Sequence, residues 1–309
     1  SLAVLEKKVL IVDADPQANA SSGLGIDVRH LKNTIYECLV GSIDPHDAIC
    51  DTDLENLKII PSHVNLVGAE VEMVQLENRE MFMKNVLEQI RDEFDYVFID
   101  CSPSLGLITL NALTATDSTI IPVQCEYYAL EGIAQLLSTI KLVKSKLNPT
   151  LEIEGFLLTM YDSRTRLNNQ VVEDVRANFR DMVFDTIIQR NIKLSEAPSF
   201  QLPVVMYDAE SKGALCYMQL AKEFLDKNEL ENKEIVETTN AESDELWDGI
   251  NGVRPNEPND SLEYPLKENI KTFLSEYAVA KTEEAKTAAK HKFSEAIKDC
   301  KSKTSVLAA

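Results

Sequence analysis

The chain has 309 residues, of which 44% are hydrophobic and 27% are charged, a composition typical of a folded globular protein. The formal net charge of −20 argues against permanent coverage by nucleic acid, although a local basic patch remains compatible with it. No apolar run reaches the roughly 18–20 residues that span a bilayer and no signal-like segment opens the chain, so we expect a cytoplasmic protein.

Short apolar runs alternate with longer amphipathic segments from the first residues to about Lys227. This alternation predicts an α/β fold with a doubly wound, mostly parallel sheet that helices cover on both faces. The predicted strands are Val9–Asp13, Leu57–Ile60, Tyr96–Asp100, Thr119–Val123, Ile153–Met160 and Val183–Ile188. The predicted helices are Arg79–Glu93, Leu130–Lys146, Asn168–Arg180 and Ala214–Lys227.

The composition changes near Asn228, which gives three predicted parts. Residues 1–228 form the α/β domain. Residues 229–268 carry many carboxylates and little periodicity, with 12 acidic and 3 basic residues between Asn228 and Glu268, and they are interpreted as an acidic flexible linker. Residues 269–309 regain helical periodicity and are predicted to be a helical C-terminal segment of unknown role.

The stretch "YVFIDCSPSLG" ends a predicted buried strand with Asp100. A carboxylate at the carboxyl end of a parallel strand can hold a water of a Mg²⁺ ion opposite a nucleotide phosphate. The alternative is structural, since an aspartate at this place can also cap the helix that follows.

The stretch "KKVLIVDADPQ" gives a second acidic strand end. Asp13 and Asp15 are two residues apart, so an extended chain directs both to the same side. Two acidic strand ends in one parallel sheet suit metal-assisted phosphate chemistry, in which one carboxylate serves the metal and another orients the attacking water. The presence of both motifs favours the functional interpretation over capping.

Four longer blocks carry a resemblance to a known family: "KKVLIVDADPQANASSGLGI", "FDYVFIDCSPSLGLITLNALTATDSTIIPVQCEYYALEGIAQL", "LLTMYDSRTRLNNQVVEDV" and "IIQRNIKLSEAPSFQLPVVMYDAESKGALCYMQLAKEFL". Together they resemble the ParA/Soj family of chromosome- and plasmid-partitioning ATPases, in family order, from Ser1 to about Lys227. The related MinD family shares the early motifs, but "LSEAP" and "SKGA" are more similar to ParA.

The resemblance implies a fold of the phosphate-loop NTPase type and specific roles for site residues. Asp15 would orient water, Asp13 would be its partner at the strand end, and Asp100 would hold Mg²⁺ through water. The loop Cys101–Gly106, with Ser102, Pro103 and Gly106 at the nucleotide, would sense the γ-phosphate. The candidates for non-specific DNA contacts are Arg190, Lys193, Lys212, Arg164 and Arg166.

The resemblance also implies a working cycle. The protein would bind Mg²⁺ and ATP, form a homodimer, hold DNA of the nucleoid without sequence preference, and release it when a ParB-like centromere-binding protein stimulates hydrolysis. A few basic contacts per protomer would make that binding sensitive to salt.

The sequence departs from the family pattern in one respect. Family members begin with a strand and a "KGGVGKT"-type loop, whereas no G-x-x-x-x-G-K-[ST] occurs in these 309 residues. We therefore expect an N-terminally truncated copy of an ATPase whose sheet lacks a central strand and exposes an edge.

Two other functions stay open. One is a nucleotide-free binding or regulatory module with the same fold, and the other is a MinD-like membrane-associated ATPase. Membrane docking is disfavoured, because the apolar face of residues 269–309 is rich in alanine and holds few bulky groups.

Overall fold

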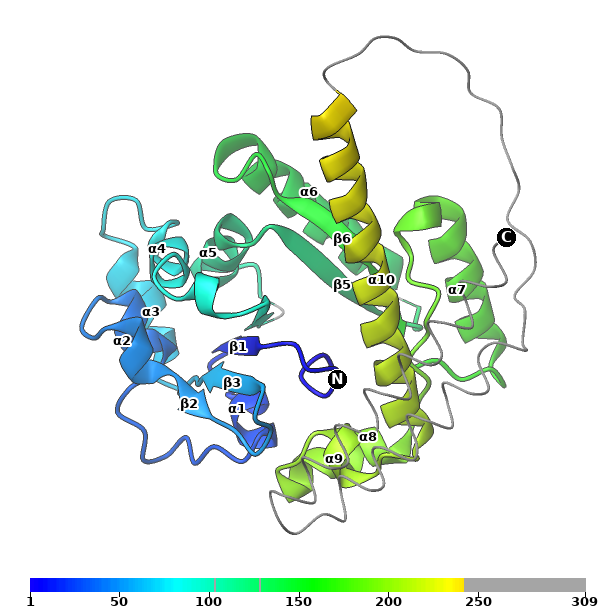
Figure 1. Ribbon diagram of the computed structural model, residues 1–309, viewed down its shortest axis with the longest axis horizontal. Helices are drawn as coiled ribbons and strands as arrows, with labels where there is room; N and C mark the ends of the chain where they lie inside the picture. The colour runs from blue at the N-terminus through cyan, green and yellow to red at the C-terminus, as the bar shows by residue number, and fades with distance from the viewer. Residues whose placement is uncertain (103, 128, 242–309) are drawn as a thin grey trace. The chain divides into compact units, whose positions relative to one another are not determined.

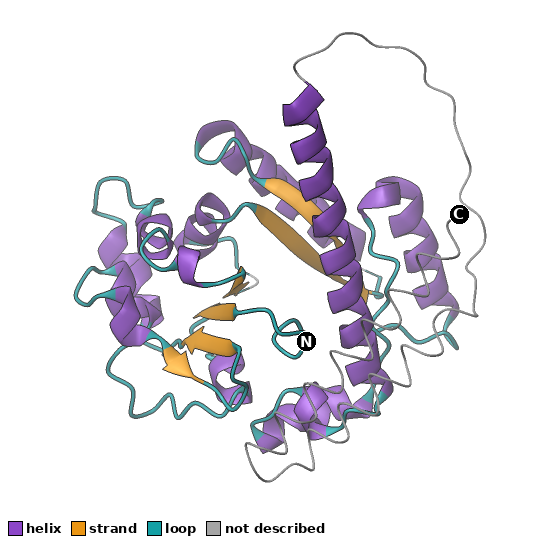
Figure 2. Ribbon diagram, viewed as in Figure 1, coloured by secondary structure: helices purple, strands orange, loops and turns teal. Residues whose placement is uncertain are grey.

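The computed structural model describes residues 1–102, 104–127 and 129–241. Residues 1–207 form one compact unit, and the chain from Asp208 onward belongs to a second. The first unit contains all the described strands and most of the described helices (Figure 2). It is a mixed α/β fold whose strand pairs are mainly parallel, as the alternation of strands and helices predicts.

The first sheet has four strands in the order β2-β3-β1-β4. Figure 1 labels β2, β3 and β1 of this sheet. Strand β1 pairs in parallel with β3 on one side and β4 on the other, while the short β2 pairs antiparallel with β3. The continuous apolar run of β1 fits its central place, since a strand covered on both faces has little need of polar residues. The bounds are β1 Val9–Ala14, β2 Cys50–Asp51, β3 Leu57–Ile60 and β4 Tyr96–Cys101.

Short helices contribute to the hydrophobic core of this sheet, which includes Leu10, Ile60, Leu66 and Met83, all fully buried. The helices are α1 Asn19–Gly23, α2 Ile35–Leu39, α3 Leu66–Met73, α4 Phe82–Leu87 and α5 Leu107–Ala115, with 3₁₀ turns η1 Pro45–Ala48 and η2 Arg91–Glu93. The predicted helix Arg79–Glu93 is thus only partly helical, because the chain turns out of α4 after Leu87 before η2 begins.

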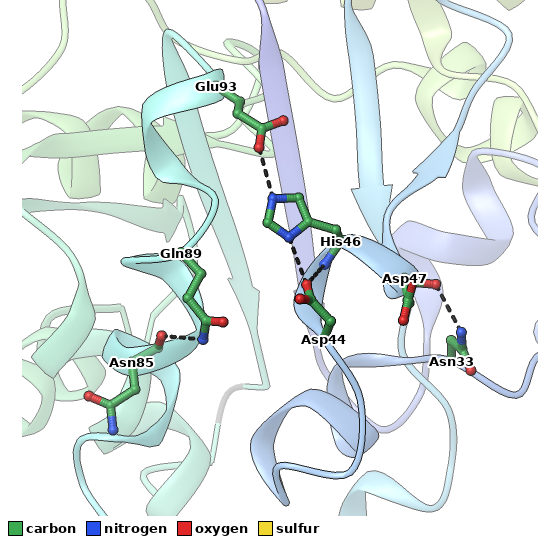
Figure 3. Close-up of polar contacts among 7 residues, drawn as sticks. All are labelled: Asn33, Asp44, His46, Asp47, Asn85, Gln89 and Glu93. Carbon is green, nitrogen blue, oxygen red and sulfur yellow. Dashed lines mark hydrogen bonds and ion pairs between the residues drawn. The ribbon is translucent and has the colours of Figure 1, made fainter.

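His46 connects two of these short elements (Figure 3). Its Nδ1 lies 2.7 Å from Oδ1 of Asp44, the residue just before η1. Its Nε2 lies 2.9 Å from Oε1 of Glu93 in η2. Hydrogen bonds to these carboxylates, first to Asp44 and then to Glu93, raise the pKa of His46. The imidazole can donate to both carboxylates only when it is protonated, so the link between η1 and η2 is strongest at acidic pH.

The second sheet consists of β5 (Ser118–Gln124) and β6 (Glu152–Thr159), which run in parallel. Helices α6 (Ala129–Lys146) and α7 (Arg166–Phe179) contribute to its core. Phe156 of β6 is fully buried and stacks on Phe179 of α7 with ring centroids 4.1 Å apart. Val171 and Val175 of α7 are buried, as their helical spacing predicts.

The predicted strand at Val183–Ile188 is wrong as a regular element. In the described part of the chain it is not a regular strand: isolated parallel bridges join Val183 to Phe156 and, just beyond the segment, Gln189 to Tyr161. The first pair is 27 residues apart along the chain and the second is 28 apart, so the register slips by one residue between them. That extra residue prevents a continuous ladder along β6.

The two sheets do not join. Among the described residues, β4 has a hydrogen-bonded neighbour only on the β1 side, and β5 has one only on the β6 side. The side chains of Tyr96, Val97, Phe98 and Ile99 are only half-buried, which is unusual for the apolar part of a parallel strand. In the described part of the chain, β4 is therefore the outermost strand of the first sheet.

The remaining elements follow β6 along the chain. In the first unit they are η3 Arg180–Met182, α8 Ile192–Glu196, η4 Ala197–Phe200 and α9 Val204–Tyr207. In the second unit, α10 extends from Lys212 to Ala241 and so includes the first residues of the segment interpreted as a linker. Residues 229–241 contain four Glu, one Lys and no Gly or Pro, which is compatible with a helix.

The rest of the proposed linker and the C-terminal segment 269–309 lie outside the described residues. Within the described part of the chain, no helix is both long enough and apolar enough to span a bilayer.

Candidate functional site

Strands β1 and β4 end side by side, and each has an aspartate as its next-to-last residue. Asp13 is the register partner of Asp100 in this parallel pair, and Ala14 is the partner of Cys101. Neighbouring strands lie about 4.8 Å apart, so the two aspartates share one corner of the sheet. Asp15 follows β1 by one residue and belongs to the same corner.

The carboxyl group of Asp13 is fully buried and accepts three hydrogen bonds. The donors are the backbone N–H of Asp15 at 3.2 Å, the backbone N–H of Ser21 at 2.9 Å and the hydroxyl of Ser21 at 2.6 Å. The Ser21 hydroxyl in turn accepts a hydrogen bond from the backbone N–H of Ser62 at 3.1 Å, just after β3. Asp13 therefore fixes the turn between β1 and α1 and connects it to the next strand.

Asp15 lies in that turn and is half-buried. Its side chain accepts a hydrogen bond from the backbone N–H of Gln17 at 3.0 Å, and its own carbonyl accepts one from the backbone N–H of Ala18 at 2.9 Å. Ala18 adopts a left-handed conformation with φ of 53°, which lets α1 begin at the next residue. The turn holds the Asp15 backbone in place at the sheet edge.

The side chain of Asp100 is exposed at the end of β4, yet its environment disfavours the charged form. The pKa of Asp100 is raised from 3.8 to about 6, mainly because the surrounding protein removes solvent from the carboxyl group. The negative charges of Asp13 and Asp15 add to this effect. The three carboxyl groups are thus close enough to influence one another electrostatically. A cation at this corner would relieve that repulsion.

The donor set fits a hydrated Mg²⁺ ion better than a metal held directly by protein. Among residues 1–102, 104–127 and 129–241 there is no cluster of three or more His, Cys, Asp or Glu side chains arranged to hold a metal. Mg²⁺ keeps several of its waters and commonly binds proteins through one or two carboxylates together with substrate phosphates. Asp100 suits that arrangement.

The loop after β4 leads from Asp100 into α5. Pro103, one of its predicted nucleotide contacts, lies outside the described residues. The hydroxyl groups of Ser102 and Ser104 are 3.4 Å apart, and the Thr109 hydroxyl donates to the Ser104 carbonyl at 2.6 Å. Cys101 does not supply a reactive thiolate, because burial and then the charges of Asp100 and Asp15 raise its pKa to about 12.

Gly106 ends this loop where α3 approaches closely. A Cβ atom at Gly106 would overlap the carboxylate of Glu70. Glu70 also accepts a hydrogen bond from the backbone N–H of Ile108 at 3.4 Å. Gly106 leaves room for the Glu70 carboxylate at the end of this loop, and the sequence contained no local signal that would have identified Glu70 as its neighbour.

The basic candidates gather partly around one carboxylate. Arg164 makes a bidentate contact with Asp162, at 2.9 Å and 2.6 Å, while its side chain remains 86% exposed. The hydrogen bonds from Arg164 lower the pKa of Asp162 to about 2, and the charge of Arg190 adds to this effect. The Arg190 backbone N–H donates to the Tyr161 carbonyl at 2.9 Å, which places Arg190 beside the same loop.

The other basic candidates differ in their surroundings. The Lys193 ammonium lies 3.0 Å from Glu196 and 5.4 Å from the ring centre of Tyr207. Arg190 also forms a longer ion pair with Glu126 at 3.8 Å. Arg166 is exposed at the first residue of α7, and Lys212 is exposed at the first residue of α10 in the second unit. Neighbouring carboxylates thus reduce the positive potential at three of the five candidates.

The sequence matches known proteins over most of the described chain. Residues 1–153 match a family described as an AAA domain. The chain is 54% identical to the sporulation initiation inhibitor protein Soj of Bacillus subtilis over 222 residues, which are 72% of this chain and 88% of that protein. It is 50% identical to the chromosome partitioning protein ParA of Myxococcus xanthus over 228 residues, 74% of this chain and 81% of the relative.

Solved structures give the same result for the fold. A cobyrinic acid a,c-diamide synthase from Mycobacterium smegmatis, solved with an ATP analogue and magnesium, is 38% identical with a TM-score of 0.58, covering 64% of this chain and 83% of that one. A putative plasmid partition protein from Borrelia burgdorferi, solved with AMPPNP, is 27% identical with a TM-score of 0.61, covering 73% and 89% of the two chains.

Proposed function

The chain belongs to the ParA/Soj family of chromosome-partitioning ATPases, and on this premise we propose that its Asp13, Asp15 and Asp100 form the metal-binding side of an ATPase site. The observation that carries the proposal is the meeting of three carboxyl groups at the paired ends of β1 and β4, where loss of solvent and then the charges of Asp13 and Asp15 raise the pKa of Asp100. Relatives with solved structures bind ATP analogues, one of them with magnesium.

Each aspartate has a separate role in this proposal. Asp100 holds Mg²⁺ through a bound water, and Asp15 orients the water that attacks the terminal phosphate. Asp13 is a positioning residue, because its hydrogen bonds to Ser21 and to the Asp15 backbone hold the turn in shape. The Mg²⁺–ATP complex supplies the phosphoryl group and the positive charge that these carboxylates lack.

The site also needs backbone amides that cradle phosphates, and the 309 residues contain no G-x-x-x-x-G-K-[ST] motif to supply them. The edge of the first sheet where β1 and β4 end together is where such a loop would fit. A parallel strand that ends at this edge would deliver the loop that follows it beside Asp100. We propose that the active form of the site contains such a strand.

The wider cycle is proposed from the family. The protein would dimerise with Mg²⁺ and ATP, hold nucleoid DNA in the cytoplasm through Arg164, Arg166, Arg190, Lys193 and Lys212, and release it on hydrolysis stimulated by a ParB-like partner. The pairing of Arg164, Arg190 and Lys193 with carboxylates favours weak, salt-sensitive DNA contacts over a tight grip.

The test compares two proteins, the 309-residue chain and the same chain with a strand and a "KGGVGKT"-type loop fused before Ser1. Titration with fluorescent ATP and Mg²⁺ measures binding, and phosphate release measures turnover. We expect micromolar binding and turnover for the extended protein. In that protein Asp15→Ala should abolish turnover but leave binding, while Asp53→Ala, in the turn between β2 and β3, should change neither. Normal hydrolysis by the Asp15→Ala protein would refute the role given to Asp15.

A second candidate function rests on the missing phosphate motif. A nucleotide-free binding module with the same fold would keep its partner surfaces without ATP. This function predicts that the 309-residue chain is folded, binds no fluorescent ATP, and keeps the same oligomeric state with and without Mg²⁺ and ATP.

A further inference from the structure

Helix α3 and the turn residues at its two ends carry a row of exposed valines. Val64, Val67, Val71 and Val74 follow one another at intervals of three and four residues, the spacing of one helix face, and are here called the valine stripe. Their exposed fractions are 62%, 56%, 72% and 51%. Isolated exposed valines are ordinary, but four within 11 residues, at the spacing of one helix face, form an apolar surface.

The stability of α3 does not explain the valine stripe. The opposite face of the helix already provides its anchor, because Leu66, Ala69 and Met73 are fully buried in the core of the first sheet. Valine is also a weaker helix former than alanine or glutamate, since its branched side chain loses rotamer freedom in a helix. Four valines on the solvent face therefore suit contact with another molecule better than contact with water.

Contacts on both sides hold α3 in place. The Tyr36 hydroxyl of α2 donates a hydrogen bond to Glu72 at 2.9 Å. On another side, Glu70 accepts the hydrogen bond from the Ile108 backbone and lies against Gly106. The stripe is thus presented on a fixed element, which lowers the entropy lost when a partner binds.

The charge around the stripe is strongly negative. Between His63 and Glu80 there are four glutamates, Glu70, Glu72, Glu77 and Glu80, and one arginine. That arginine, Arg79, is itself bound to Glu80 at 3.2 Å and to the Val74 carbonyl at 2.6 Å. A second copy of the chain packed stripe against stripe would bring these glutamates together, and like charges disfavour that pairing.

We propose that the valine stripe is a docking surface for an amphipathic helix of a partner protein, with aliphatic residues along its centre and Lys or Arg along its flanks. The helical part of the stripe, α3, has 8 residues and is about 12 Å long, so a partner helix of about two to three turns covers it. Its basic flanks would lie near the glutamates that border the stripe. The surface makes no use of the nucleotide site and so extends beyond the proposed function.

The valine stripe is also connected through α3 to the loop at the candidate nucleotide site. Glu70 belongs to the same helix and contacts the end of the loop that follows Asp100. A partner bound on α3 would therefore touch the element that supports this loop, although the docking itself needs no nucleotide.

The test uses the 309-residue chain and two fluorescein-labelled helical peptides of two heptads each. Both have leucine at the a and d positions, and the flanking e and g positions hold lysine in one peptide and glutamate in the other. Fluorescence anisotropy measures binding to the unmodified chain, to Val67→Ser/Val71→Ser and to Val71→Lys. The matched control is Leu142→Ser, since Leu142 is an exposed aliphatic residue of α6 with an exposed fraction of 51%. Circular dichroism checks that each variant is folded.

The expected result is binding of the lysine peptide to the unmodified chain and to Leu142→Ser, weakened at least tenfold by either change in the stripe and by added salt. The glutamate peptide should bind at least tenfold more weakly. Equal binding to Leu142→Ser and to the stripe variants, equal binding of both peptides, or no binding of the lysine peptide would overturn the proposal. A dimer that the stripe variants dissociate in sedimentation would also overturn it, because a second copy would then cover the stripe.

Discussion

Replacing Asp100 with asparagine should stabilise the folded protein at neutral pH. In the folded state, loss of solvent and the charges of Asp13 and Asp15 raise the pKa of Asp100 from 3.8 to about 6. A change of this size would correspond to about 3 kcal/mol for a group fully removed from water. Because the side chain is exposed, solvent screening reduces the expected effect to about 1 kcal/mol.

The sign of the effect gives it a characteristic pH dependence. The folded state binds the Asp100 proton more tightly than the unfolded state, so this group lowers the free energy of unfolding as pH rises from about 4 to about 6. Asparagine has no such penalty. The advantage of Asp100→Asn should be close to zero near pH 4 and reach its full size by pH 7.

Urea unfolding followed by circular dichroism, in EDTA and at several pH values, measures this difference. Asp53→Asn is the control, because it removes an exposed aspartate from the turn between β2 and β3. Millimolar MgCl₂ in place of EDTA should stabilise the unmodified protein more than Asp100→Asn. Parallel stability curves for the two proteins from pH 4 to pH 7 would refute the electrostatic account of this corner.

Three further changes test other contacts. His46→Gln should lower the melting temperature at pH 6, where the protonated imidazole donates hydrogen bonds to Asp44 and Glu93. It should have little effect at pH 9, because this stabilisation is lost as the pH rises through the raised pKa of His46. Ser21→Ala should lower the free energy of unfolding, measured in urea, by about 2 kcal/mol, because it removes a hydrogen bond to buried Asp13 and leaves the Ser62 N–H without its acceptor. An equal loss of stability in Ser22→Ala would contradict this account. In the loop-extended protein with ATP, Arg164→Gln/Arg190→Gln should weaken binding to duplex DNA and reduce its salt dependence in anisotropy titrations, whereas unchanged salt dependence would exclude these residues from the DNA surface.

The strands were predictable where an apolar run is continuous and a neighbour pairs along its whole length. Strands β1 and β4 satisfy both conditions, and the sequence places these two strands and β3 within one residue of their observed ends. The segment from Val183 to Ile188 has the same apolar character, but its register against β6 slips, and register depends on partners that a single sequence does not reveal. Local pattern alone does not distinguish these cases.

The site was predictable to a similar depth. Parallel strands end at a common edge, so the meeting of Asp13 and Asp100 follows from recognising the two strands. The hydrogen bonds from Ser21 to Asp13 depend on the turn geometry across eight residues, for which "NASSG" gives only the hint of small polar side chains. Helix α3 was not predicted, because apolar residues on both of its faces obscure a helical period.

The interruption between β4 and β5 has a consequence for how the first unit unfolds. Each sheet has its own hydrophobic cluster, one built around Leu10 and Ile60 and the other around Phe156 and Leu158. No ladder of backbone hydrogen bonds crosses between them in the described residues, so the loss of one cluster does not require the loss of the other. The amide protons of β1 and those of β6 are therefore expected to exchange with solvent through separate opening events, as two cooperative blocks within one compact unit.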